Sequence, residues 1–165
     1  MPHLRLEVAE EWLREDFKQA TGFDAKKLLD HLVRVVAGLR MEKPVLEARL
    51  DANGKPIPPE MVPMINLSNL KHAIVPLYYA HVAGDPAKRF LHVTLSAGND
   101  TPGRTAAVRL HAAQILGDEV DKFTGALPGL AGLASVTAHV LDINRDRGYS
   151  TTAERKKKRE AAKIT

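Results

Sequence analysis

Apolar and polar side chains alternate strictly along residues 3–8, HLRLEV. Alternation places the apolar members of this segment on one face of an extended backbone, and they are Leu4, Leu6 and Val8. The pattern therefore predicts a strand with one buried face. A short polar segment follows it and carries two large aromatic side chains, Trp12 and Phe17.

Residues 23–40 have the pattern of an amphipathic helix. Six apolar side chains recur there at the spacing of one helix face: Leu28, Leu29, Leu32, Val35, Val36 and Leu39. Asp24 is the expected N-cap, because its carboxylate can accept hydrogen bonds from the first backbone N–H groups of the helix. Arg40 lies at the C-terminal end, where a positive charge offsets the helix dipole.

The second half of the chain repeats this order. Phe90 to Leu95 are rich in strand formers, a loop of turn-forming residues follows, and residues 104–123 have apolar side chains at helical spacing. Either Thr101-Pro102 or Thr105 is expected to begin that helix. A glycine-punctuated connection then leads to a strand over residues 135–143.

A strand over residues 72–82 would close the first unit, and Pro76 predicts that it lies at a sheet edge. Strand, helix and strand thus occur twice, and we expect one α+β domain over residues 1–150 with right-handed crossovers.

Between the units, residues 43–71 hold five of the ten prolines. Asn53-Gly54 in this segment is a hairpin-turn signal. We interpret the segment as an inserted hairpin and irregular arm.

Composition narrows the class of protein. The hydrophobic share of 44% and the charged share of 27% are typical of a globular domain. The sequence has no run of about 18 apolar residues that could span a membrane, no secretory signal pattern and no cysteine. We therefore expect a cytoplasmic protein that contacts no membrane and has no disulfides or zinc–thiolate sites.

The net charge of +4 originates at the end of the chain. The last twelve residues, ERKKKREAAKIT, hold six Lys or Arg and two Glu, which is +4, so the preceding residues sum to zero. A nucleic-acid-binding domain carries its positive charge on the folded body. We therefore interpret residues 151–165 as a solvated basic tail. An arm that binds nucleic acid or another partner is the alternative for this tail, and the neutral body makes nucleic-acid binding the weakest of the candidate functions.

Most catalytic motifs are absent from the sequence. None of the seven histidines falls into a metal-ligand pattern such as H-E-x-x-H, and no dinucleotide-binding or P-loop pattern occurs. Ser135 does not lie in a G-x-S-x-G elbow. We therefore predict neither a metal nor a cofactor. One chemical group remains, which is the secondary amine that Pro2 carries once Met1 is removed.

An N-terminal proline amine is suited to general base catalysis. An ordinary α-amino group has a pKa of about 7.7–8.0, and both burial and a nearby positive charge lower that pKa. A base whose pKa lies near the working pH is the most effective, and the proline ring fixes φ. Such a base can move a proton between an enol oxygen and a carbon of a conjugated system, which is tautomerisation without a cofactor.

Several segments together resemble one family. MPHLRLEV, EEWLRED, LLDHLVRVVAGL, FLHVTLSAGNDTPGRTAAVRLHAAQIL and VTAHVLDINRDRGYSTT are similar to the 5-carboxymethyl-2-hydroxymuconate isomerase branch of the tautomerase superfamily. The resemblance covers most of residues 1–40 and 72–150, and leaves out the proline-rich insertion and the tail. It implies a β-α-β-β-α-β fold, assembly as a homotrimer, and Pro2 as the catalytic base.

The resemblance also implies basic residues that bind a substrate carboxylate. Arg104 matches one of them, and its place ahead of a helix suits an anion site. The family has a second basic residue on the strand after the first helix, where our alignment has Val75. Lys71 and Arg89 are the available substitutes.

We therefore predict an isomerase that moves a proton in a small unsaturated 2-oxo or 2-hydroxy acid, with Pro2 as the base. The alternative is a tautomerase-like domain without catalytic activity, which serves as a binding or assembly module through its insertion and its tail. The mismatch at Val75 favours this alternative.

Overall fold

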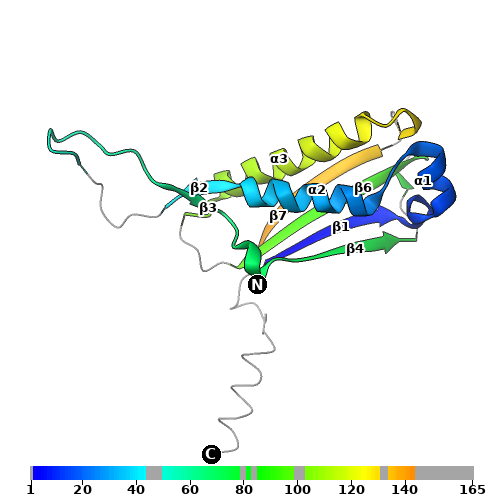
Figure 1. The fold of residues 1–165 in the computed structure, drawn as a ribbon, viewed down its shortest axis with the longest axis horizontal. Helices are drawn as coiled ribbons and strands as arrows, with labels where there is room; N and C mark the ends of the chain where they lie inside the picture. The colour runs from blue at the N-terminus through cyan, green and yellow to red at the C-terminus, as the bar shows by residue number, and fades with distance from the viewer. Residues whose placement is uncertain are drawn as a thin grey trace, which may run out of the picture.

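The structure is a computed structural model, and it describes residues 2–43, 50–78, 81–82, 85–98, 103–130 and 134–143. The tail predicted over residues 151–165 lies outside them. Two long helices, α2 (Ala25–Gly38) and α3 (Ala106–Gly125), lie side by side on one face of a sheet (Figure 1).

The sheet joins strands that are far apart in the sequence. They are β1 (His3–Ala9), β4 (Lys71–Leu77), β5 (His81–Val82), β6 (Asp85–Gly98) and β7 (Ala134–Ile143). β1 pairs in parallel with β4 and antiparallel with β6, and β7 pairs in parallel with β6. Helix α2 connects β1 to β4, and α3 connects β6 to β7. The predicted α+β fold with the order β-α-β-β-α-β is confirmed.

Two short helices follow β1 where we predicted only a polar segment. They are η1 (Glu10–Leu13) and α1 (Glu15–Thr21). Trp12 stacks on Phe17 with 5.3 Å between ring centroids, and it meets the ring of Phe23 edge-on at 5.4 Å. A seven-residue helix is marginal by itself, so this aromatic packing holds α1 in place.

The strands also differ in length from those predicted. β6 extends through Gly98, because Ser96 still pairs with His3 of β1 and with Leu141 of β7. The prediction that the loop begins directly after Leu95 is therefore wrong. The strand predicted over residues 72–82 is divided into β4 and β5, and β4 with Pro76 lies at a sheet edge as predicted.

Side chains begin both long helices. The Asp24 carboxylate accepts hydrogen bonds from the backbone N–H groups of Lys26 (3.0 Å) and Lys27 (3.2 Å), which confirms the predicted cap. Of the two expected starts of α3, Thr105 is the correct one, because its hydroxyl accepts the N–H of Val108 at 3.3 Å.

We expect Asp24→Ala to lower the free energy of unfolding by about 1 kcal/mol, the usual effect of losing an N-cap. Chemical denaturation measures this difference. Asp30→Ala is the matched control, because Asp30 is exposed on the same helix away from its first turn, and we expect it to change stability by less than about 0.5 kcal/mol. Equal effects of the two substitutions would contradict the capping role.

The Asp24 carboxylate also makes the stability depend on pH. Burial by itself raises the pKa of Asp24, but the Lys27 N–H, the Lys18 ammonium 3.1 Å away and the Lys26 N–H together hold that pKa below its ordinary value. The stabilisation is therefore present above the unfolded-state pKa, about 3.9, and is lost as the pH falls through the folded-state pKa. We expect the stability difference between the wild type and Asp24→Asn to shrink below about pH 4.

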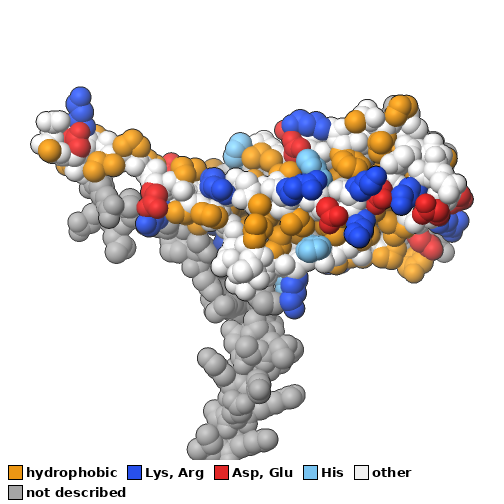
Figure 2. All heavy atoms as spheres, viewed as in Figure 1, with side chains coloured by type: hydrophobic (Ala, Val, Ile, Leu, Met, Phe, Trp, Pro, Cys, Tyr) orange, Lys and Arg blue, Asp and Glu red, His pale blue; other side chains and the backbone are white. Residues whose placement is uncertain are grey.

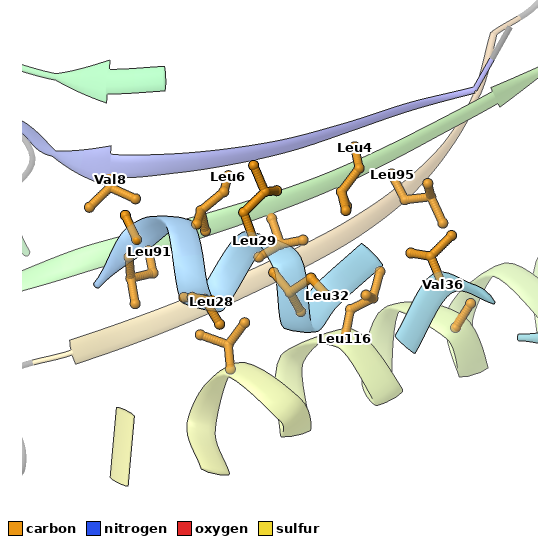
Figure 3. Close-up of a cluster of buried hydrophobic side chains, with 14 of the residues drawn as sticks. Leu4, Leu6, Val8, Leu28, Leu29, Leu32, Val36, Leu91, Leu95 and Leu116 are labelled. Carbon is orange, nitrogen blue, oxygen red and sulfur yellow. The ribbon is translucent and has the colours of Figure 1, made fainter. Parts of the chain in front are cut away.

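The core lies between the sheet and the two long helices (Figure 3). The predicted buried face of the first strand is confirmed, since Leu4, Leu6 and Val8 are all fully buried. Side chains of the two helices belong to the same cluster, and the fully buried ones are Leu28, Leu32, Val36, Leu116 and Val120. This packing fixes β1 in the middle of the fold, and so determines where its first residues lie.

An antiparallel ribbon of two strands projects from the body (Figure 1). Its base is β2 (Arg40–Glu42) paired with β3 (Met61–Pro63). Nearer the tip, Leu50 bridges Pro56, and the Asp51 N–H donates to the Lys55 carbonyl at 2.8 Å. The predicted turn at Asn53-Gly54 is present, with Gly54 at φ 73°, where glycine is favoured. That these residues are an insertion stays a prediction.

Candidate active site

Pro2 lies at the end of the sheet where β1 begins. Its carbonyl accepts the backbone N–H of Lys71 at 3.0 Å. The next residue, His3, is paired with Lys71 on one side and with Ser96 on the other. Pro2 is half-buried. The nitrogen of this residue therefore lies where β4 begins and β6 ends.

The segment 63–71 leads into this end of β4. Met64 and Ile65 are buried, and the Asn66 side chain accepts the Ser68 N–H at 3.1 Å, which begins the short helix η2 (Leu67–Asn69). A cavity of about 440 Å³ opens on this segment and on the end of α2, and its lining residues are Ala37, Pro63, Ile65, Asn66, Leu67 and Ser68.

Arg104 contacts the same segment. It follows Gly103, whose φ of 92° favours glycine. The Arg104 Nη2 donates to the Met64 carbonyl at 3.2 Å, and the Arg104 carbonyl accepts a hydrogen bond from Arg109 at 2.9 Å. One segment therefore connects Arg104, at Met64, with Lys71 and Pro2. The tertiary structure brings three of the predicted site residues to one end of the sheet.

Arg89 lies at the other end of the sheet. It is seven positions before Ser96 on β6, which corresponds to about 23 Å along a strand. Its guanidinium forms an ion pair with Glu11, and it is paired with His81 and Ala134. The structure does not bring Arg89 to Pro2.

Arg40 is a basic residue near this site that our sequence analysis assigned only to the helix end. It begins β2 and pairs with Pro63, so it lies at the start of the segment 63–71. Its guanidinium donates to the Ala37 carbonyl at 2.8 Å, as expected at a helix C-terminus. The strand that directly follows α2 is thus β2, whereas Val75 lies on β4 opposite Glu7. Recognising residues 40–42 as a strand would have identified Arg40 as the basic residue on the strand after that helix.

No protein-family model matches the sequence, and no curated protein is significantly similar to it. Solved structures are similar in fold. A crystal structure of 5-carboxymethyl-2-hydroxymuconate delta-isomerase has a TM-score of 0.57 at 15% sequence identity, with 92% of this chain and 87% of that chain covered. The tautomerase-like fold predicted from the sequence is therefore confirmed.

Two further structures support the same fold. A 5-carboxymethyl-2-hydroxymuconate isomerase from Deinococcus radiodurans R1 has a TM-score of 0.55 at 16% identity, covering 91% of this chain and 88% of that one. Pt0534, in a crystal structure inactivated by 2-oxo-3-pentynoate, has a TM-score of 0.51 at 15% identity, covering 92% and 93%.

In this tautomerase-like fold, the surroundings of His3 show the electrostatics beside Pro2. The Nε2 atom of His3 is buried and has no hydrogen-bond partner among the described residues. Burial first, and then the positive charges of the amino terminus, Lys71 and Arg5, hold the pKa of His3 below its ordinary value.

Among the described residues, no three His, Asp or Glu side chains lie close enough together to hold a metal ion. Within the same part of the chain, no helix is long and apolar enough to cross a membrane.

Proposed function

We propose that this protein is a cofactor-independent tautomerase or isomerase that acts on an unsaturated 2-oxo or 2-hydroxy acid. The amine of Pro2, exposed by removal of Met1, is its general base. One observation carries the proposal: the segment 63–71 is hydrogen-bonded to Arg104 at Met64 and to Pro2 at Lys71, and a cavity of about 440 Å³ opens on the residues between these two contacts. A base and a carboxylate-binding cation are the two groups that this chemistry requires.

The reaction follows from these groups. The guanidinium of Arg104 binds the substrate carboxylate, because its planar donors match the two oxygens. Lys71, whose backbone N–H donates to the Pro2 carbonyl, supplies further positive charge. The neutral amine of Pro2 takes the proton of the enol hydroxyl, and the resulting ammonium returns that proton to a carbon of the conjugated chain. The enol becomes a ketone, and the amine is neutral again.

Arg40 bears on the alternative of a binding module without activity. That alternative was favoured by the mismatch at Val75, because the sequence predicted that the helix over residues 23–40 leads to a strand without a Lys or Arg. Arg40 supplies a cation on β2, the strand that directly follows α2. We therefore include Arg40 as a second group for the substrate carboxylate, and we favour the enzyme.

The similar structures support the proposed chemistry, since two of them are isomerases of 5-carboxymethyl-2-hydroxymuconate. We also propose a homotrimer in the cytoplasm. The outer edges of β4 and β7 have no paired strand in the described part of the chain, and open edges favour pairing between subunits.

The compound 2-oxo-3-pentynoate, which inactivates Pt0534, tests the proposed base. A neutral amine at residue 2 would add to its alkyne, forming an N–C bond while the amine proton moves to the adjacent carbon. We expect one adduct per chain, located by peptide mass spectrometry on the N-terminal peptide at Pro2. Protonation of the amine should slow the labelling as the pH falls.

Lys71→Arg is the matched control, because it removes the neighbouring amine of Lys71 and keeps its charge. Labelling at Pro2 should persist in this variant. A label found on Lys71, or an N-terminal peptide that stays unlabelled in a folded protein, would contradict the proposal.

A further inference from the structure

The outer part of the projecting ribbon exposes apolar side chains. Every residue from Leu50 to Glu60 is exposed; we call these residues the arm. Leu50 is 57% and Ile57 47% exposed, and Met61 at the base of the ribbon is 56% exposed. Figure 2 shows hydrophobic side chains along this projection. A ribbon of two strands is marginally stable in water without further packing. Burying these apolar side chains against another surface would therefore stabilise the arm.

The prolines of the arm favour packing through side chains over pairing through backbone hydrogen bonds. Pro56, Pro58 and Pro59 have no N–H to offer a neighbouring strand, and a proline also restricts the residue before it to extended backbone. The tip is held by the Asp51 carboxylate, which accepts the backbone N–H groups of Asn53 and Lys55, both at 2.8 Å. The arm therefore presents a preorganised apolar edge rather than an open strand.

A groove accompanies the base of the ribbon. It lies between β2, β3 and the first turns of α3, with a volume of about 570 Å³. Its apolar side chains come from both sides, and they are Met41, Pro59, Met61, Ala107 and Val108. The body thus offers an apolar groove beside the point from which an apolar arm projects.

We propose that the arm binds a second copy of this chain, so that two arms lie antiparallel about a two-fold axis. Gly54 at the tip and Met61 at the base are equally distant in sequence from the midpoint between Ile57 and Pro58. An axis at that midpoint therefore places the tip of each arm at the base groove of the other. One arrangement covers the arm and the groove of both copies, as a two-fold interface requires.

The charges at the two ends fit this arrangement. The tip has one charge of each sign, Asp51 and Lys55, and the base also has both signs, with Lys43 and Glu42 among the residues of the groove. Each tip charge can therefore lie beside an opposite charge of the other copy. The inference does not rest on the proposed enzymatic function.

Sedimentation equilibrium tests the proposal by molar mass. We expect the double variant Leu50→Asp/Ile57→Asp to have half the molar mass of the wild type, because buried carboxylates would separate the arms. The mass falls from six chains to three if the subunits also form trimers, and from two to one if they do not. The control is Leu13→Asp/Leu110→Asp, which changes two exposed side chains of the body (39% and 61%) and should keep the wild-type mass.

The absence of cysteine allows a second measurement. Ile57→Cys places a single thiol beside the axis, and we expect mild oxidation at micromolar concentration to link the chains into disulfide dimers. Leu110→Cys, on the outside of α3, should not link. Circular dichroism should show that each variant is folded, since none of these side chains is in the core.

Halved mass in the arm variant together with cross-linking at residue 57 supports the arrangement. A wild-type mass in the arm variant would overturn it, because the arm would then serve another partner or none. Absence of the Ile57→Cys dimer would equally overturn the two-fold placement.

Discussion

Replacing Pro2 with alanine is expected to lower turnover by about 10²- to 10⁴-fold, the range of general base catalysis. The variant still ends in an amine once Met1 is removed, but that amine is primary and lacks the ring that fixes its direction. Ultraviolet absorbance follows the conversion of enol to ketone for a panel of 2-hydroxydienoic acids. Unchanged turnover in the variant would contradict the proposed mechanism.

The fold should be unaffected by this substitution. The contact of Pro2 with β4 is made by its backbone carbonyl, which accepts the Lys71 N–H, and alanine retains that carbonyl. A second variant, with one alanine added before Pro2, converts the proline nitrogen into a tertiary amide that cannot take a proton. We expect it to be inactive and to melt at the wild-type temperature. If the wild type converts no acid of the panel, the alternative of a module without activity gains support.

The largest effect on stability is expected from Leu116→Ala. Leu116 lies on α3 and is fully buried against the sheet (Figure 3). Removing its side chain loses apolar contact and leaves a cavity, and such substitutions lower the free energy of unfolding by about 2–5 kcal/mol. Denaturation by urea measures the loss, and the slope of the transition should stay unchanged if the native fold is kept.

Leu110→Ala is the matched control for this prediction. Leu110 lies on the same helix and is 61% exposed, so the same chemical change there should alter stability by less than about 0.5 kcal/mol. A similar loss in both variants would show that burial does not determine the effect, since alanine is the better helix former at both positions, and the assigned core would be wrong.

Local patterns predicted the elements whose signal lies within a few residues. Alternation from His3 to Val8 identified β1, and the apolar spacing after Asp24 identified α2 together with its cap, because burial of one face imposes a period on the sequence. The hairpin turn at Asn53-Gly54 was also predicted, since a turn with positive φ restricts residue type. The small helix α1 was missed because its stability comes from packing between Trp12, Phe17 and Phe23.

The sequence by itself determined the buried face of β1, the order of the long strands and of the two long helices, and Pro2 as the residue with the chemistry to be tested. Only the tertiary structure decided which cations accompany Pro2. Lys71 donates its backbone N–H to Pro2, and Arg104 donates to Met64 at the other end of the same segment. Arg40 begins β2 at the start of that segment, and Arg89 lies about 23 Å away along β6. The physical reason is that strand pairing joins residues distant in the chain, and no local pattern records that distance.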